Sequence, residues 1–158
     1  MKPNEIFKEL KVHFGEEITE LVENPSSDTY ISVKPEKIDE ICRFLRDNDA
    51  FKFDFLTLLS GLDLKEKLGI VYHLYSMELK HRLVLKTEVP KDSPNLPSLV
   101  RVWRTADWHE REAFDMFGIN FQGHHNLIRI LCPYDWEGYP LRKDYKEPEE
   151  YHGNRVPY

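Results

Sequence analysis

Residues 51–89 read FKFDFLTLLSGLDLKEKLGIVYHLYSMELKHRLVLKTEV, and this stretch predicts three consecutive strands. Phenylalanine stands at every second position from Phe51 to Phe55, the period of a strand with one buried face, and the apolar run continues to Leu62. Strands joined by short turns form an antiparallel meander. The expected elements are strands over Phe51–Leu62, Ile70–Met77 and Leu83–Val89, a hairpin loop at Asp63–Gly69 and a turn near Leu79–His81.

Two amphipathic helices and a short strand are expected before the meander. Apolar residues recur at helical spacing in both helical segments, and Cys42 falls on the apolar stripe of the second. A proline opens each segment, and a glycine follows the first. The expected elements are a helix over Pro3–Phe14 ending at Gly15, a turn at Asn24-Pro25-Ser26-Ser27, a strand over Tyr30–Val33 and a helix from Glu36 to about Asn48.

A third helix is expected after the meander. A short apolar piece, Leu99–Trp103, leads to Thr105, which can cap a helix that runs to Phe117 and ends at Gly118. Two helices, a meander and a third helix predict an α+β fold in which helices pack on a mostly antiparallel sheet.

Composition indicates one globular domain. The chain has 158 residues, of which 41% are hydrophobic and 32% are charged. A formal net charge of −6 argues against nucleic acid as a partner, because phosphate neutralisation needs clustered lysine and arginine. No apolar run approaches the ~18 residues of a spanning helix, and MKPNEIFKEL lacks the apolar stretch of a signal peptide.

The sequence offers few signals for cofactors. Cys42 and Cys132 are the two cysteines, without CxxC spacing, so one chain cannot ligate an iron–sulfur cluster. The nucleotide and nucleophile motifs GxGxxG, GxxxxGKS and GxSxG are absent from the sequence. We therefore expect no catalytic, cofactor-binding or metal-binding residues in this chain.

The densest group of titratable residues lies on the third predicted helix. His109 and Glu110 begin like the zinc motif HExxH, but Ala113 stands where the second histidine is needed. Glu112 and Asp115 share a helical face with His109, which could hold a metal or perform acid–base chemistry. Helical carboxylates near arginine are more often partners in ion pairs, so ion pairing is the favoured interpretation. His124-His125 is interpreted as a turn in which histidine bonds the backbone.

The C-terminal stretch has a different composition. From about Pro133 it is rich in tyrosine, tryptophan, glycine, proline and paired charges, which suit binding hot spots. Composition alone leaves open whether this stretch docks on another subunit or wraps around its own domain. We expect residues 1–118 to form the α+β domain and residues 119–158 to form an extended arm for subunit docking.

The last third of the chain carries three motif blocks, EREAFDMFGI at 110–119, HHNLIRIL at 124–131 and GYPLRKDY at 138–145. In this order and spacing they closely resemble the signature of the C subunit, the 30-kilodalton subunit family, of respiratory complex I, the NADH:quinone oxidoreductase. His-Pro, two basic residues, and histidine or tryptophan are common in the family where this chain has His124-His125, Ile128-Arg129 and Tyr139. The signature and interface residues that the resemblance implies are Glu110, Arg111, Glu112, Asp115, Met116, Phe117, Gly118, His124, Arg129, Gly138, Pro140, Leu141, Arg142, Lys143, Asp144 and Tyr145.

The resemblance implies a non-catalytic subunit of the peripheral arm of a proton-translocating complex. FMN and iron–sulfur clusters are then carried by partner subunits, which transfer electrons from NADH to quinone. The implied neighbours are the D subunit and the iron–sulfur subunits, and the chain would have no membrane span of its own. The implied place is the cytoplasmic side of the bacterial inner membrane, or the matrix- or stroma-facing equivalent.

Two alternatives remain open from sequence. One is the equivalent subunit of a related membrane-bound hydrogenase or of a ferredoxin-driven or plastid-type complex. The other belongs to a different class, a stand-alone metal-dependent hydrolase that would use His109, Glu112, Asp115 and His124.

Overall fold

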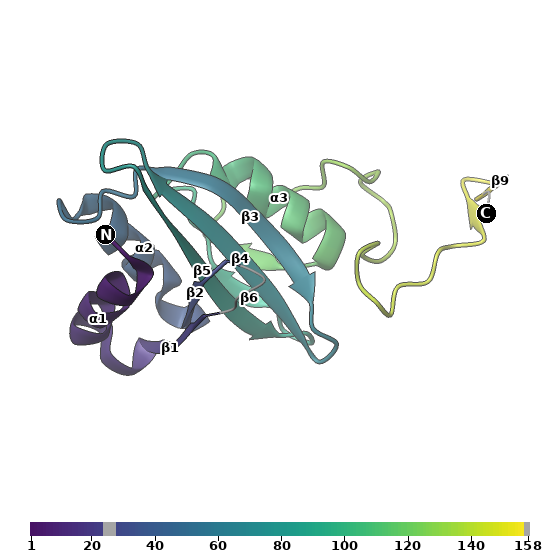
Figure 1. Ribbon diagram of the computed structural model, residues 1–158. Helices are drawn as coiled ribbons and strands as arrows, with labels where there is room; N and C mark the ends of the chain where they lie inside the picture. Colours follow the sequence, from purple (N-terminus) through teal and green to yellow (C-terminus); the bar gives the residue numbers. More distant parts are fainter. Residues whose placement is uncertain (24–27, 157–158) are drawn as a thin grey trace.

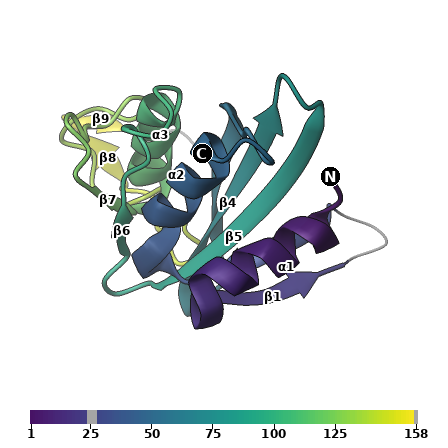
Figure 2. The ribbon, with the colours of Figure 1, turned by 90° about the vertical axis from the view of Figure 1, so that its left-hand side faces the viewer.

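The computed structural model describes residues 1–23 and 28–156. Three helices cover one face of a five-stranded sheet, and a long C-terminal segment leaves this body (Figures 1 and 2). The helices are α1 (Pro3–Phe14), α2 (Ile38–Asp47) and α3 (Ala106–Phe117), with short 3-10 turns at Gly15–Glu17 and Pro35–Lys37. The strands are β1 (Ile18–Val22), β2 (Tyr30–Val33), β3 (Phe55–Asp63), β4 (Lys67–Ser76), β5 (His81–Pro90), β6 (Asn95–Pro97), β7 (Asn120–Gln122), β8 (Glu150–Tyr151) and β9 (Asn154–Arg155).

The main sheet has the strand order β1-β2-β5-β4-β3. Neighbouring strands are antiparallel except for β2 and β5, which run parallel. Strand β4, which lies between β5 and the edge strand β3, turns Leu68, Ile70, Tyr72 and Leu74 toward the helices, and all four are buried. The predicted α+β class with a mostly antiparallel sheet is confirmed.

The two N-terminal helices follow their apolar spacing. In α2, Ile38, Ile41, Cys42 and Leu45 are fully buried, as residues one turn apart on one helical face should be. In α1 the buried residues are Ile6 and Leu10, and the helix ends at Gly15 with a φ of 54°. Strand β2 matches its prediction, whereas the turn predicted at Asn24-Pro25-Ser26-Ser27 lies outside the described residues.

The predicted start of the first meander strand is wrong. Strand β3 begins at Phe55, and the preceding residues form a turn in which Lys52 has a φ of 44°. Phe51 and Phe53 are nevertheless buried in the core, and the Phe53 amide donates to the Leu45 carbonyl at 3.0 Å. The alternation of phenylalanine from Phe51 to Phe55 is therefore not due to a strand over its whole length, because a turn places the rings of Phe51 and Phe53 in the core.

The first hairpin is tighter than expected. The ladder continues to the pair Asp63 and Leu68, so β4 begins at Lys67 and not after Gly69. The Asp63 carboxylate accepts the Lys65 amide at 2.7 Å, which lets the chain turn within three residues.

Several ladders have no counterpart in the sequence prediction. Strand β1 pairs with β2, and β6 pairs in parallel with β7 beyond the third helix. Helix α3 ends at Gly118 as predicted, with a φ of 72°, but the Thr105 hydroxyl does not cap it and donates instead to the Leu56 carbonyl. Ile119 and Phe121 are buried in the core. The predicted division of the chain at residue 118 remains a prediction.

Beyond β7, the described part of the chain has no helix, and its only ladder joins the two-residue strands β8 and β9. Figure 1 shows this segment leaving α3 and ending away from the body of the domain. Across residues 1–23 and 28–156, no helix is long and apolar enough to cross a membrane.

Close packing of α3 on β3 gives a direct test of the fold. A Cβ added at Gly61 would lie 2.5 Å from the Phe117 ring, whereas one at Gly69 would meet Leu64 at 3.3 Å. We expect Gly61→Ala to lower the free energy of unfolding by about 1 to 3 kcal/mol through overpacking, measured by urea denaturation. Gly69→Ala is the matched control and should cost less; equal losses would contradict the packing of α3 on β3.

Candidate functional site

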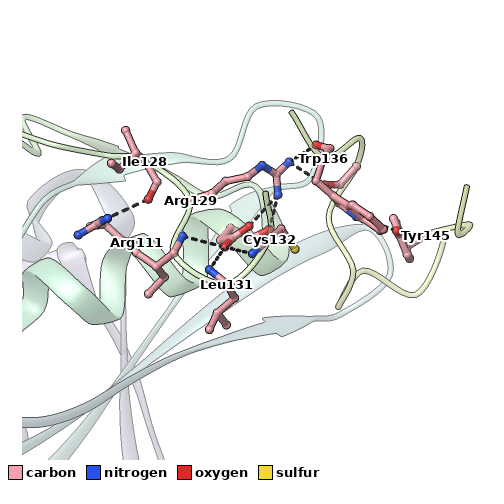
Figure 3. A network of polar contacts seen from close by, with 10 residues as sticks. Arg111, Ile128, Arg129, Leu131, Cys132, Trp136 and Tyr145 are labelled. Carbon is pink, nitrogen blue, oxygen red and sulfur yellow. Dashed lines mark hydrogen bonds and ion pairs between the residues drawn. The ribbon is translucent and has the colours of Figure 1, made fainter. Parts of the chain in front are cut away.

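The predicted signature residues converge on the C-terminal half of α3. On a helix of 100° per residue, Asp115 lies on the side opposite Glu110, which faces the core. The loop after β7, in which Figure 3 labels Arg129, Leu131 and Cys132, folds over Asp115. This outward side chain is therefore also fully buried. We call the contacts between Asp115 and residues 129–132 the Asp115 clamp.

Every oxygen of the Asp115 carboxylate is used in this clamp. Oδ1 accepts a hydrogen bond from the Arg129 guanidinium at 2.7 Å. Oδ2 accepts the backbone amides of Ile130, Leu131 and Cys132 at 2.9, 2.6 and 3.0 Å. Burial alone would raise the pKa of the Asp115 carboxyl, but these N–H donors favour the charged form and hold its pKa below the usual range.

Arg129 extends the clamp into the C-terminal segment. Its guanidinium also donates to the Asp115 carbonyl at 3.1 Å, and to the carbonyls of Trp136 and Gly138 at 2.9 and 2.8 Å. One side chain, 12% exposed, therefore joins α3, the loop and residues 136–138 further along the predicted arm (Figure 3).

Tyr139 packs against the end of α3. A Cβ at Gly118 would lie 2.4 Å from the Tyr139 ring, so the glycine permits both the left-handed helix end and this approach. The Arg142 guanidinium lies 4.8 Å from the centre of the same ring, and its Nε donates to the Phe117 carbonyl at 2.6 Å. The Leu141 amide donates to the Met116 carbonyl at 3.1 Å.

A second anchor lies at the β3–β4 hairpin. The Asp63 carboxylate accepts the Lys143 amide at 2.8 Å and the Lys91 ammonium at 3.0 Å, and Lys91 also pairs with Asp144 at 2.8 Å. The Lys143 amide is the main reason that the pKa of Asp63 falls to about 2. The Arg142-Lys143-Asp144 triplet thus contacts its own domain, and its contact with another subunit remains a prediction.

Glu110 occupies a different environment on the core side of α3. Its carboxylate accepts the Ser98 hydroxyl and the Leu99 amide, both at 2.6 Å. Burial raises the pKa of Glu110 to about 7; the two hydrogen bonds oppose this shift and the nearby Asp107 adds to it. Glu110 and Asp115 are thus carboxyl groups of one helix whose pKa values move in opposite directions.

The histidine pair lies beside this group. The His124 side chain is fully buried, and its Nδ1 accepts the Asn126 amide at 3.0 Å, which places the proton of the neutral ring on Nε2. Nε2 lies 3.3 Å from both the carbonyl and the carboxylate of Asp107, and 4.0 Å from the Glu110 carboxylate. His125 stacks on His124 with ring centres 5.1 Å apart. His124 therefore bonds the backbone at a turn.

The metal site of the hydrolase alternative is not assembled. The Asp115 carboxylate faces the loop, whereas His124 is buried beside Glu110. Glu112 is exposed and forms no ion pair with any described residue. Within residues 1–23 and 28–156, no group of three or more histidine, cysteine, aspartate or glutamate side chains could hold a metal ion.

The structure gathers most of the signature into one connected set. Arg111, outside this set, donates to the Ile128 carbonyl at 3.2 Å, and Pro140 is half-buried. The sequence did not single out Asp63, Lys91, Ser98 or Asp107; an acidic residue closing a buried strand is the signal that could have indicated Asp63. The connected set is Asp115, Met116, Phe117, Gly118, Arg129, Gly138, Leu141, Arg142, Lys143, Asp144 and Tyr145.

This fold and site define a class of protein, a small α+β domain whose third helix fastens a C-terminal segment through buried polar contacts. A family model described as the respiratory-chain NADH dehydrogenase 30 Kd subunit matches residues 31–151. The chain therefore belongs to the family of the 30 Kd subunit of respiratory-chain NADH dehydrogenase, as the motif resemblance predicted.

Individual relatives agree with this family. The C subunit of the NADH-quinone oxidoreductase of Chlorobium phaeobacteroides (strain DSM 266 / SMG 266 / 2430) is 47% identical over 148 residues, covering 92% of this chain and 89% of the relative. The trypsin-resistant fragment 1–134 of Nqo5 is 27% identical with a TM-score of 0.66, covering 80% of this chain and 100% of the fragment. A chain of the membrane-bound sulfane sulfur reductase, an archaeal respiratory membrane complex, is 26% identical with a TM-score of 0.74. The match covers 92% of this chain and 86% of that chain. This chain is thus a subunit that partners other subunits of a complex.

The Asp115 clamp predicts a large stability effect. Asp115→Asn removes the charge that faces Arg129 and places an amide where four donors converge, so we expect a loss of about 3 to 5 kcal/mol in the free energy of unfolding. Urea denaturation measures it. Glu112→Gln, an exposed change on the same helix, is the control and should shift stability by less than about 0.5 kcal/mol. A loss of under about 1 kcal/mol for Asp115→Asn would contradict the clamp.

Glu110 predicts a pH dependence. Its native pKa of about 7 lies above its ordinary value of 4.5, so between these values the native state binds the extra proton and stability falls as pH rises. Relative to Glu110→Gln, the wild type should lose about 3 kcal/mol between pH ~4.5 and pH ~8, measured by urea denaturation across this range. Parallel pH profiles for the wild type and Glu110→Gln would show that Glu110 is not the titrating group.

Proposed function

We propose that this chain is a non-catalytic structural and assembly subunit of the peripheral arm of proton-translocating NADH:quinone oxidoreductase. It supports electron transfer from NADH, through FMN and iron–sulfur clusters in partner subunits, to quinone. Its neighbours are the D subunit and the iron–sulfur subunits. It acts on the cytoplasmic side of the bacterial inner membrane, or on the matrix- or stroma-facing equivalent.

The observation that carries this proposal is the closed Asp115 clamp. A catalytic carboxylate must present a free oxygen to substrate, but the Asp115 oxygens accept from Arg129 and from three loop amides. The residues most typical of the family thus hold the chain's own C-terminal segment in place. This arrangement suits a subunit that presents a surface to its neighbours.

The cysteines support the assignment of clusters to partner chains. Cys42 is fully buried in α2, and burial raises its pKa well above the ordinary value. Burial and the nearby Asp115 raise the pKa of Cys132 as well. An iron–sulfur cluster takes four cysteine ligands, whereas this chain has two cysteines.

The C-terminal segment supports docking on another subunit. Among the described residues, 145–156 hydrogen-bond only within the segment from residue 135 onward, through contacts such as Trp136 to Tyr145 at 3.0 Å and Tyr151 to Asp135 at 2.8 Å. Tyr134 is 92% exposed. The similar Nqo5 structure is a trypsin-resistant fragment that covers 80% of this chain. We propose that the segment after Asp144 is the part of the arm that contacts a partner.

The equivalent subunit of a related respiratory membrane complex is a second candidate. The similarity to a chain of the archaeal sulfane sulfur reductase complex, at 26% identity, favours it. The higher identity of 47% to the C subunit of an NADH-quinone oxidoreductase favours the NADH-linked complex.

The test is purification of the complex through a tag on this chain in its own host. The full-length chain should bring down NADH:quinone activity, flavin and cluster signals, whereas the isolated chain should show no visible absorption band. A chain shortened after Asp144 should keep its circular dichroism and melting transition but recover less than about a tenth of the complex, since the docking segment supplies its anchor contacts.

Val12→Ala, which changes an exposed residue of α1, is the control and should recover the complex at the wild-type level. A flavin, cluster or metal stoichiometric with the isolated chain would contradict the non-catalytic assignment. Normal recovery with the shortened chain would show that the arm does not dock.

A further inference from the structure

The outer face of α3 exposes a tryptophan that the fold does not use. Trp108 is 63% exposed, although tryptophan is usually among the more buried residue types. The opposite face of the helix is packed in the core through Ala106, Glu110 and Ala113. Asp115 lies on the same outer face two turns later, where the loop covers it. The loop that buries Asp115 therefore leaves Trp108 exposed.

The Trp108 ring packs against the Arg111 side chain. The Arg111 guanidinium lies 4.7 Å from the ring centre, and Arg111 Nε donates to the Ile128 carbonyl at 3.2 Å. Figure 3 shows Arg111 and Ile128 side by side along α3. Ile128 is itself 53% exposed. An aromatic ring that already packs on a neighbouring side chain loses less conformational entropy when a partner covers it, which favours its use as an anchor.

The charges beside Trp108 are unmatched. Arg104 lies in the exposed turn just before α3, four residues before Trp108, and Arg111 stands one helical turn after Trp108. Neither guanidinium forms an ion pair with a carboxylate in the part of the chain described, whereas Arg43 and Arg129 pair with Asp39 and Asp115. The chain as a whole has a net charge of −6, whereas the charged groups that we identify on either side of this exposed indole are two arginines without an ion pair among the described residues.

These observations specify the chemistry of an occupant. An apolar side chain would cover the exposed indole and Ile128, and carboxylates would face Arg104 and Arg111. Glu112 is the exposed carboxylate that follows Arg111, and it would lie at the rim. We call Arg104, Trp108, Arg111 and Ile128 the α3 patch. It is separate from the docking segment after Asp144.

We propose that the α3 patch is a second docking surface, on which Trp108 anchors an acidic segment of a neighbouring subunit. Trp108 enters the apolar part of that segment, and Arg104 and Arg111 pair with its carboxylates. The inference rests on this chain being a subunit of a larger complex. It says which kind of partner would bind the α3 patch, a face of the domain that the C-terminal segment does not cover.

The experiment uses the tagged full-length chain in its host complex. Trp108→Ala and Arg104→Glu should each weaken association with the remaining subunits about 10-fold or more, as loss of a hot-spot residue does, and the wild-type association should weaken with added salt. Arg104→Lys should retain most of the association. The controls are Val12→Ala and Lys8→Glu on α1, which make an apolar truncation and the same charge reversal at exposed positions and should stay within about two-fold of wild type.

A second readout follows the indole itself. The chain is labelled with 5-fluorotryptophan and followed by fluorine NMR, and the signal that is absent from the spectrum of Trp108→Phe is assigned to Trp108. On assembly, the difference in chemical shift of this signal between H2O and D2O should disappear, because a partner then covers the indole. A photo-crosslinker at position 108 should join a partner peptide that contains Asp or Glu. Normal association of Trp108→Ala, a solvent-exposed Trp108 in the complex, or crosslinks to lipid or to a basic peptide would overturn the proposal. Failure of the wild-type chain to recover any complex would instead refute the proposed function.

Discussion

The buried carboxylate of Asp115 is the interaction on which the C-terminal third of the structure depends. An ionised carboxylate is costly to bury unless every lone pair has a donor, and here a guanidinium and three consecutive amides supply them. Because Arg129 also binds the carbonyls of Trp136 and Gly138, the requirement at Asp115 fixes the path of the chain well beyond the loop. Gly118 then lets Tyr139 approach the end of the helix.

The two sides of helix α3 give their buried carboxyl groups opposite pKa shifts, because one side faces the core and the other faces the loop after β7. On the core side, Glu110 has two donors and an apolar setting, so burial dominates and its pKa rises to about 7. On the outer side, Asp115 has more donors, and its charged form is favoured despite burial. The helix thus connects the α+β core to the segment that we propose for docking, and its N-terminal turns leave Trp108 available to a partner.

Local patterns in the sequence predicted much of this fold. The stripe that contains Cys42 predicted α2, and alternation predicted β2 and the cores of β4 and β5. The start of β3 was wrong because turn residues Phe51 and Phe53 are buried with the same period as a strand. Strand β1 was not predicted because its buried and exposed residues do not alternate and a register shift lies between Ile18 and Glu20. The β6–β7 ladder was not predicted because segments of three residues carry little periodic signal.

The site could be predicted only in part. Ion pairing at Asp115 follows from a helical carboxylate near arginine, and the structure identifies Arg129 as its partner. The three amides on Oδ2 could not be predicted, because backbone donors leave no mark in the sequence. Asp63 and Lys143 are 80 residues apart, so only the folded chain brings them together.

The most direct measurement of this account is hydrogen–deuterium exchange of the full-length chain, followed at single amides by NMR. If Asp115 holds the loop as described, the amides of Ile130, Leu131 and Cys132 should exchange as slowly as those in the middle of α3. Exchange at these three amides as fast as at Glu147 would contradict the account, because the clamp would then not hold the C-terminal segment to the domain.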